Sequence, residues 1–475
     1  MAGFKQAWSG VFQRSSQRRR GRSATAASVR CEPLERRALL SGNGAGSTVL
    51  CTVVDEIGDT YLAGSFRGAV DFDPGPGVAT LASRGRSDAF LLKLDAAGGL
   101  LWAKSFGSAG DDAVKGIALN PLGDDVLVVG HYSGTLAMDP TDPEAVLPGA
   151  GRRDGFIASF DSDGNDVWAR SFGGSLMDGI NAVAIARTGT VYVGGEFAGS
   201  VDFDLLNGGE VLTSTGRGGR TDGFVAAYSL LGDCLWARGV GGGKDDAVLG
   251  IAVDGNGMVV AVGDFQHVVD FDPGAGVVRS QSRGEEDGFV LALDTAGDYL
   301  WSFTFGDRGE DAARAVACDA AGNVFVGGEF ERTVDFDPSS GRTSLRSAGE
   351  KDGFVAKYSA EGGFAWVRGF GSPKEDGIFA VALDPSGGVV AGGQRAEAVS
   401  ETTWSRGRPQ TRIRWRDAGY AVKLDDAGQT VWSASFLAAA VGSGANHDHD
   451  DDDDDDDDDK REERRRHCYA SVRGD

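Results

Sequence analysis

Residues 287–306 read DGFVLALDTAGDYLWSFTFG, which is two apolar runs joined by a glycine-containing turn and marked by a tryptophan at position 301. Six tryptophans mark equivalent places along the chain, and their numbers differ in turn by 66, 68, 65, 65 and 66. They are Trp102, Trp168, Trp236, Trp301, Trp366 and Trp432. Self-similarity at a nearly fixed period is the signature of a chain built from repeated supersecondary units. The sequence therefore predicts six copies of one unit.

Each unit contains four strand-like runs, and these runs decide the fold class. Typical examples are, in order, Gly250–Asp254, Val324–Phe330, Asp222–Tyr228 and Trp168–Phe172. Short glycine-containing links between the first and second runs, and between the third and fourth, predict hairpins. Both faces of the third run are apolar and need cover, and helical periodicity is missing. We therefore predict an all-β fold, a six-bladed β-propeller with four antiparallel strands per blade.

The division of the units into blades stays open at this point. The pattern begins with a first and a second run near residues 48–66 and ends with a third and a fourth run near residues 419–436. Either the blades are contiguous, or the first and last half-units join across the termini. Both divisions give six blades, and closing the ring removes the sheet edges that invite aggregation.

The repeated motifs resemble a known family. They are Val-Asp-Phe-Asp-Pro-Gly at 70–75 and 269–274, Asp-Gly-Phe-Val at 222–225, 287–290 and 352–355, and Trp-Ala-Arg-Ser-Phe-Gly at 168–173. Over roughly residues 48–436 the units look like the bacterial SBBP-type β-propeller repeat. The resemblance implies a propeller in an exported bacterial protein and no general catalytic role. Unit two (residues 136–140) and unit six (an arginine-rich stretch at 395–416) depart from the motif, so we expect irregular blade edges there.

The two ends of the chain differ in composition from the repeats. Residues 1–44 form a basic leader, in which Glu32-Pro-Leu-Glu35 and Leu39-Leu-Ser41 are similar to the LEPR-XLL export segment. Residues 45–437 contain the six repeats, and residues 438–475 form a low-complexity acidic and then basic tail. Charge at this density opposes a buried core, so we expect the tail to be disordered. Together the two resemblances imply an extracellular or cell-surface location.

Composition excludes several classes of partner and cofactor. The formal net charge is −24, and an acidic body repels the phosphate backbones of nucleic acids. No apolar run approaches the length of a membrane span. The five cysteines include no Cys-x-x-Cys pair, so neither a zinc site nor a disulfide framework is indicated. We expect a monomer without a nucleic-acid partner and without a transmembrane segment.

Two aspartate positions recur at the starts of strands. One precedes the third run, at Asp88, Asp154, Asp222, Asp287, Asp352 and Asp417. The other follows the fourth run, at Asp112, Asp178, Asp246, Asp311 and Asp376. Catalysis needs one unequal constellation, whereas these positions repeat from unit to unit. An aspartate at a strand start accepts backbone N–H bonds and fixes the turn, so we assign both sets a structural role.

The Asp-Phe-Asp element supplies the candidate metal ligands. Its carboxylates are Asp71, Asp73, Asp202, Asp204, Asp270, Asp272, Asp335 and Asp337. Alternate residues of a strand face the same way, so each pair presents two carboxylates together, and Ca²⁺ takes several oxygen ligands. A full calcium loop would carry further oxygen ligands, so a bracing turn is favoured and calcium is the alternative. No other cofactor is expected.

The candidate ligand-binding residues are those that vary while their neighbours stay apolar. They lie directly before the aromatic residue that closes the second run, or at the aligned place in unit six: Ser65, His131, Glu196, Asp264, Glu329 and Gln394. Equivalent positions of a propeller form a ring at one end, and a polar ring of varied identity suits a sugar, a peptide or a cation. The alternative is a set of solvated strand ends.

No motif in the chain names a reaction. Walker, GxSxG and HExxH patterns do not occur, and the repeated tryptophans indicate packing between blades more than sugar platforms. The sequence favours a non-enzymatic, exported propeller that binds a protein or a glycan at one end. A propeller enzyme, a glycan hydrolase or lyase, stays as the alternative, with Glu196, Asp264 and Glu329 as its possible acids.

Overall fold

The computed structural model describes residues 46–139, 144–204, 206, 208–384, 388–405 and 408–437, and every helix or strand element in them is a strand. This confirms the all-β prediction. The leader and the tail lie outside the described residues, so what was predicted for them stays a prediction. In the described part of the chain, no helix is long and apolar enough to cross a membrane.

The strands form six antiparallel four-stranded blades, each contiguous in sequence. Blade 1 contains β1 (Gly46–Val54), β2 (Thr60–Arg67), β5 (Asp88–Leu94) and β6 (Leu100–Phe106). Blade 2 contains β7 (Ala113–Leu119), β8 (Val126–Tyr132), β11 (Asp154–Phe160) and β12 (Asp166–Phe172). Blade 3 contains β13 (Gly179–Ile185), β14 (Val191–Ala198), β17 (Thr221–Tyr228) and β18 (Cys234–Gly242).

Blades 4 to 6 repeat the same order. Blade 4 contains β19 (Asp246–Val253), β20 (Val259–Phe265), β23 (Asp287–Leu293) and β24 (Tyr299–Phe305). Blade 5 contains β25 (Ala312–Cys318), β26 (Val324–Asp335), β27 (Ser344–Tyr358) and β28 (Phe364–Phe370). Blade 6 contains β29 (Gly377–Leu383), β30 (Val389–Ser405), β31 (Arg408–Leu424) and β32 (Thr430–Leu437). Of the two divisions that the sequence allows, the structure has contiguous blades.

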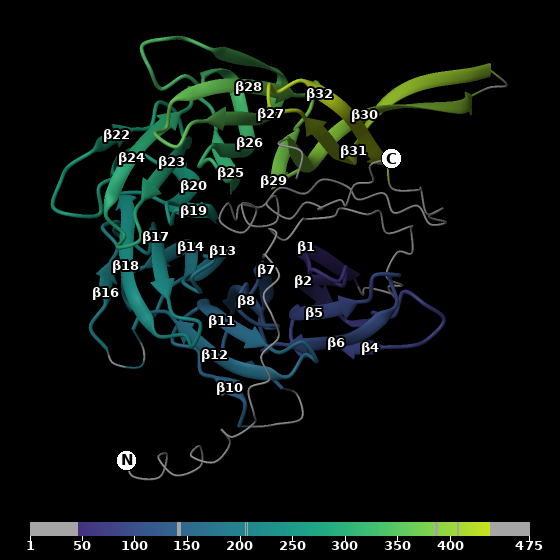
Figure 1. Ribbon diagram of the computed structural model, residues 1–475. Coiled ribbons are helices and arrows are strands. Elements are labelled where there is room, and N and C mark those ends of the chain that lie inside the picture. Colours follow the sequence, from purple (N-terminus) through teal and green to yellow (C-terminus); the bar gives the residue numbers. More distant parts are fainter. Residues whose placement is uncertain are drawn as a thin grey trace, which may run out of the picture.

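The first strand of each blade lies nearest the propeller axis. Consecutive first strands pack against one another, β1 on β7, β7 on β13, β13 on β19, β19 on β25 and β25 on β29. Figure 1 shows the blades following one another around this centre from purple to yellow. A side chain that leaves a first strand on its axial side therefore points toward the middle of the molecule.

Both faces of a blade are buried, as the two-sided apolar pattern predicts. In β17, Phe224 and Ala226 pack in one cluster with Leu127 of blade 2. The intervening Val225 and Ala227 belong to a different cluster, which includes residues of blade 4 such as Leu291. Alternate side chains of one strand thus join it to the blade before and to the blade after. Burial between blades is the main stabilising contribution to this arrangement.

The marker tryptophans clamp each blade to the next one. In five consecutive junctions the indole N–H donates to a backbone carbonyl in the turn between the third and fourth strands of the following blade, at 2.8–3.0 Å. The donors are Trp102, Trp168, Trp236, Trp301 and Trp366. The ring covers a turn glycine with φ of 74–82°, where a Cβ would lie 2.7–3.1 Å from ring atoms. The predicted packing role of these tryptophans is confirmed.

At each end of the series of blades, one half of this tryptophan–glycine junction lacks its partner. Trp432 of β32 has no hydrogen-bond partner among the described residues for its indole N–H. Gly98 of blade 1, with φ of 84°, has no atom within 4 Å of a Cβ position. Phe436 is 40 % exposed, whereas Phe106 and Phe305, its equivalents in blades 1 and 4, are 1 % and 2 % exposed. The clamp is therefore present five times and not between blade 6 and blade 1.

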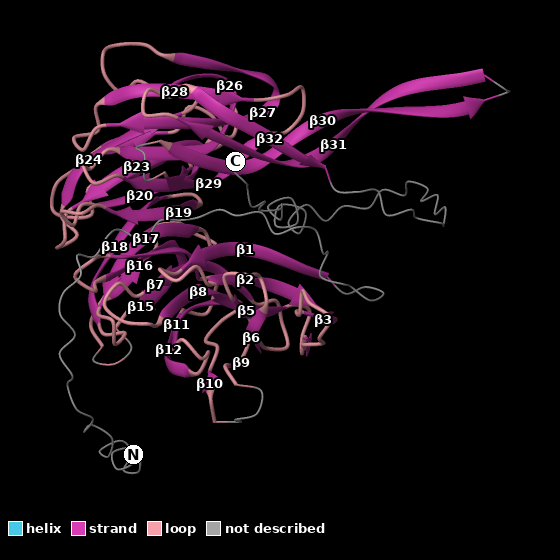
Figure 2. Cartoon of the chain, turned by 45° about the vertical axis from the view of Figure 1, so that its right-hand side comes forward, coloured by secondary structure: helices cyan, strands magenta, loops and turns pink. Residues whose placement is uncertain are grey.

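Short ribbons continue the outer ends of the blades. They are β3 (Ala69–Asp71) with β4 (Thr80–Ala82), β9 (Leu136–Ala137) with β10 (Val146–Leu147), β15 (Ser200–Asp202) with β16 (Val211–Thr213), and β21 (Val268–Asp270) with β22 (Arg279–Gln281). In unit two the ribbon shrinks to two residues per strand. In unit six, β30 and β31 run on as a long ribbon that projects from the molecule (Figures 1 and 2). Both predicted irregular edges are confirmed.

Candidate functional site

Every blade carries a β-bulge at the same place in its first strand. The pairing of the first strand with the second skips one residue in each blade. We call the six skipped residues the bulge set: Leu50, Lys115, Asn181, Leu249, Arg314 and Phe379. All six are partly buried, and a bulge re-aims its side chain out of the regular ladder. The fold thus presents one irregular residue per blade on the strand nearest the axis.

A glycine in the second strand makes the bulge possible. In blade 4, a Cβ on Gly263 would lie 1.9 Å from the carbonyl oxygen of Ala247. The equivalent glycines of the other blades meet the same obstacle at 1.9–2.0 Å, and they are Gly64, Gly130, Gly195, Gly328 and Gly393. Only a residue without a side chain allows the two backbones to approach this closely.

The six predicted ligand-binding residues directly follow these glycines, and we call them the second-strand set. Each pairs with the first-strand residue two positions before the bulge, as Glu329 does with Ala312 in blade 5. The two sets therefore lie at the same end of the blades. Asp264 and Glu329 are only 5 % and 8 % exposed, and Ser65, His131, Glu196 and Gln394 are partly buried. The side chains of the second-strand set are thus more buried than those of solvated strand ends would be.

Glu329 is held as a carboxylate by two cations. Its Oε1 lies 2.6 Å from the Arg314 guanidinium of the bulge set and 3.3 Å from Lys351 Nζ. Lys351 also contacts Glu310 at 2.7 Å. Burial alone would raise the pKa of Glu329, but Arg314 and Lys351 lower it to about 2. A general acid must be protonated near neutral pH, so this environment does not suit the acid role considered for Glu329.

Glu196 takes part in an ion pair between blades. Its Oε1 lies 2.5 Å from Arg153, and both side chains are largely buried. Arg153 precedes β11 of blade 2 and forms a parallel bridge with Met177, which precedes β13 of blade 3. The pair therefore ties two neighbouring blades together at the end that carries both sets. Removing one partner would leave a buried charge unpaired, which is the costly case for such pairs.

The Asp-Phe-Asp loops are braced by their own backbone. In blade 4, Asp270 Oδ1 accepts the N–H groups of Asp272 (3.3 Å) and Val278 (2.8 Å), and Asp272 Oδ1 accepts that of Gly274 (2.8 Å). The loops at Asp71, Asp202 and Asp335 repeat the first of these bonds. The Phe271 side chain between the carboxylates is fully buried. These hydrogen bonds are the ones that a bracing turn requires, and they leave the choice between a bracing turn and a calcium site open.

Calcium binding at these loops stays a prediction. Within the described ranges, no group of three or more histidine, cysteine, aspartate or glutamate side chains is placed to hold a metal ion. Each loop offers two carboxylates, and each Oδ1 already accepts backbone N–H groups in blades 1 and 4. A bound Ca²⁺ would therefore need several further oxygens from water or a ligand.

The aspartates at strand starts fasten loops to blades. Asp246 accepts the N–H groups of Gly242 at 2.6 Å and Gln266 at 2.9 Å, and its equivalents do the same in four other blades. The set before the third strand accepts backbone N–H groups in units one to five. The predicted structural role is thus confirmed there. It was wrong for Asp417, which is exposed in the ribbon of blade 6 and faces Ala396.

Burial makes the aspartates after the fourth strand hard to ionise. It raises the pKa of Asp246 to about 8, of Asp311 to about 7, and of Asp112 and Asp178 to about 6. Their backbone N–H donors lower the pKa, but by less than burial raises it. Because this pattern recurs in blade after blade, it reflects the packing of the repeat and not one catalytic centre.

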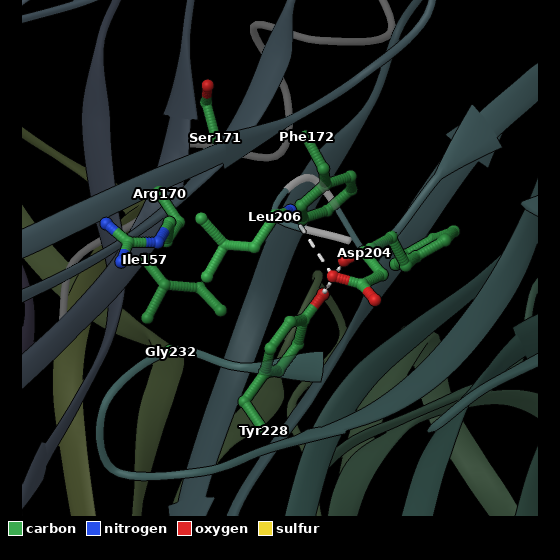
Figure 3. A pocket seen from close by; sticks show the side chains of 9 residues that line it. Ile157, Arg170, Ser171, Phe172, Asp204, Leu206, Tyr228 and Gly232 are labelled. Carbon is green, nitrogen blue, oxygen red and sulfur yellow. Dashed lines mark hydrogen bonds between the residues drawn. The ribbon is translucent and has the colours of Figure 1, made fainter. Parts of the chain in front are cut away.

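Two hollows between blades are lined by residues of neither set. Figure 3 shows one between blades 2 and 3, where Arg170 and Phe172 lie across from Asp204 and Tyr228. Its volume is about 10 Å³, which is room for roughly one water molecule. The other, of about 250 Å³, lies between blade 3 and the Asp-Phe-Asp loop of blade 4.

The sequence interpretation missed the bulge set. Lys115 and Arg314 stand inside otherwise apolar first runs, and this misfit was the available signal. A bulge shifts the inward and outward alternation by one residue, so its position follows from the strand pairing and not from one run alone.

No known protein-family model matches this chain. Over 274 residues it is 24 % identical to "Regulatory protein FlaEY" of Caulobacter vibrioides, a match that covers 57 % of this chain and 26 % of that protein. Over 369 residues it is 21 % identical to an uncharacterized WD repeat-containing protein of Acanthamoeba polyphaga mimivirus, covering 66 % and 27 % of the two chains. The chain thus spans about a quarter of the length of these relatives.

Among solved structures, one similar chain is a member of the DUF4221 family from Bacteroides vulgatus. The TM-score is 0.30 and the identity 11 %, over 73 % of this chain and 87 % of that one. The class of the protein follows from its own blades: it is a six-bladed β-propeller.

Proposed function

We propose that this propeller is an exported binding module without catalytic activity, and that it holds a protein or glycan ligand at the axial end formed by the bulge set and the second-strand set. One observation carries the proposal. The same backbone position presents side chains of five different types in six otherwise similar blades. Variation on a uniform scaffold is what a ligand-specific surface requires.

The chemistry of the two sets fits recognition. The bulge set mixes apolar side chains (Leu50, Leu249, Phe379) with polar or charged ones, which is typical of ligand-binding surfaces. Its Asn181 amide is already used, since Nδ2 donates to the carbonyl of Val248 at 3.0 Å. The name "regulatory protein" of the Caulobacter relative also supports a binding role. Export is inferred from the leader and from the resemblance of the repeats.

A glycan and peptide array probed with the full chain tests the proposal. We expect specific binding that falls at least tenfold in the double variant Leu249→Ala, Phe379→Ala, while its unfolding stays cooperative. Val167→Ala is the matched control, because Val167 is 51 % exposed on the outer strand β12. Binding that is unchanged in the axial variant but weaker in the control variant would contradict the proposal. Turnover of an arrayed glycan would contradict it as well.

A further inference from the structure

The junction between blade 6 and blade 1 is open. Five clusters of buried apolar residues each combine two consecutive blades, from blades 1 and 2 to blades 5 and 6. The sixth cluster contains residues of blade 1 alone, among them Phe90, which Phe66 and Phe72 of the same blade cover. Within the described ranges, the packing of each first strand on the next runs from β1 to β29 and ends there. Figures 1 and 2 show blade 6 and blade 1 standing apart.

The turn between β5 and β6 of blade 1 has the same conformation as the clamped turns. In it, Asp95 Oδ1 accepts the N–H groups of Ala97 at 2.8 Å and Gly99 at 2.9 Å, and Gly98 has a φ of 84°. The clamped turn of blade 6 makes the same two bonds from Asp425, at 3.0 and 2.7 Å, around a glycine with a φ of 74°. The turn of blade 1 is therefore preformed for an indole, although no described tryptophan covers it.

Trp432 is held in the position of a clamping tryptophan. It pairs with the third strand of its blade at the same register as Trp366 does in blade 5. The Trp366 indole N–H donates to the carbonyl of Asp426, the residue after the turn aspartate of the following blade, at 2.9 Å. The counterpart of Asp426 in blade 1 is Ala96. Phe436, which is 40 % exposed, is the second apolar side chain that a following blade would bury.

Two opposing contributions set the balance between an open and a closed junction. Five junctions of one geometry fix the rotation from each blade to the next, so a sixth forms only when all of them adjust slightly. The gain is the burial of Trp432 and Phe436 and one indole hydrogen bond. This gain is smaller than at other junctions, because Ala434 stands where Arg238 and Arg368 donate to carbonyls of the next turn at 2.8–3.3 Å. A small gain against a distributed cost gives two states of similar free energy.

We propose that the propeller closes reversibly by a sixth clamp, in which the Trp432 indole N–H donates to the Ala96 carbonyl and the indole ring covers Gly98. Closure packs β29 against β1 and completes the axial end, because Leu50 and Phe379 are the members of the bulge set on the two sides of the opening. A ligand that contacts both sides favours the closed state. The device goes beyond the proposed binding role, and its test needs no ligand.

Double electron–electron resonance on the full chain tests this proposal. Spin-labelled p-acetylphenylalanine in place of Ala97 and Ala427, which are exposed in the turns of blades 1 and 6, reports the opening and leaves the five native cysteines unlabelled. A second pair, in place of Glu361 and Ala427, spans the clamped junction of blades 5 and 6 and gives the distance of a closed junction. We expect the first pair to show a longer main distance and a shorter one equal to that of the second pair, in on the order of 10 % of the molecules.

Three variants assign the shorter distance to the clamp. Trp432→Ala should remove it, because no indole then reaches the turn of blade 1. Ala434→Arg should raise its share about threefold, because it supplies the second donor that Arg368 provides in blade 5. Val431→Ala is the matched control and should leave the share unchanged, because Val431 is 57 % exposed and points to the other face of β32.

Three outcomes would overturn the proposal. The first is a single, longer distance both in the labelled natural chain and in Ala434→Arg. The second is a shorter distance that persists in Trp432→Ala, since closure would then not depend on the clamp. The third is a shorter distance in a mixture of chains that carry one label each, because a second copy would then supply the turn.

Discussion

A single glycine decides whether each blade can carry its bulge. At Gly263 a Cβ would lie 1.9 Å from the Ala247 carbonyl oxygen, a distance that real contacts do not reach. The first strand would have to move away, and the bulge residue Leu249 would move with it. The shape of the axial surface therefore depends on the second-strand glycines, which have no side chain.

The substitution Gly263→Ala should lower the free energy of unfolding by at least about 2 kcal/mol, because overpacked sites force the backbone to shift. Gly255→Ala is the matched control in the same blade, since a Cβ there meets no atom within 4 Å. Urea denaturation of both variants measures the difference. Equal stability of the two would mean that the close approach at Gly263 does not exist.

The buried aspartates predict how stability depends on pH. Burial raises the pKa of Asp246 to about 8 and of Asp311 to about 7, whereas an aspartate in an unfolded chain has a pKa of about 3.9. Between these values the folded state binds more protons than the unfolded state. The free energy of unfolding should therefore fall as the pH rises from about 5 to about 8.

Asp246→Asn should flatten this dependence, because it removes the carboxyl with the most strongly raised pKa. The exposed Asp298→Asn in the same blade should leave it unchanged. Urea midpoints at pH 5.5, 7 and 8 provide the measurement. A natural chain that gains stability from pH 5.5 to pH 8 would show that these groups are ionised in the folded state.

In the Asp-Phe-Asp loop, carboxylates accept backbone N–H groups in addition to the backbone–backbone hydrogen bond that closes the loop. Asp270→Ala removes the acceptor of two backbone N–H groups and should cost about 1–3 kcal/mol. Asp270→Asn keeps an acceptor oxygen and should cost less. Thermal melts give the comparison, and equal costs for the two variants would mean that the charge, which both remove, matters more than the hydrogen bonds.

The same melts test calcium binding at the loops. Because backbone N–H groups already brace the loop, we expect EDTA to leave the melting temperature of the natural chain unchanged. A rise in melting temperature with millimolar Ca²⁺ that disappears in Asp270→Asn, Asp272→Asn would instead identify the carboxylates as ligands.

The strands and their stacking could be predicted from the sequence, whereas two finer features could not. Phe224, Val225 and Ala226 are all apolar and point alternately to the two faces of one strand, which predicts that both faces are covered. The structure places Phe224 and Ala226 in one cluster and Val225 in another. The bulges escaped prediction because they depend on how two strands pair. The ribbon of blade 6 was predicted only as an irregularity, although the alternation of arginine with Ile413 and Trp415 is itself a strand pattern.

The molecule as a whole is held together by one kind of junction. Each blade is apolar on both faces and shields the next one, and a tryptophan joins each blade to the turn of its successor. Such stability adds up from neighbour to neighbour, as in other repeat architectures. The ends of the series differ because Trp432 and Gly98 have no matching half within the described residues.

Urea unfolding of Trp301→Ala beside Trp432→Ala is the most direct test of this junction. Trp301 donates to the Ala360 carbonyl at 2.8 Å and stacks on Phe303, so its loss should cost about 3–5 kcal/mol. Trp432 occupies the same place but has no clamp partner among the described residues, so its loss should cost less than about 1 kcal/mol. A cost near zero for Trp301→Ala, or equal costs for the two variants, would contradict a propeller built from five tryptophan-clamped junctions.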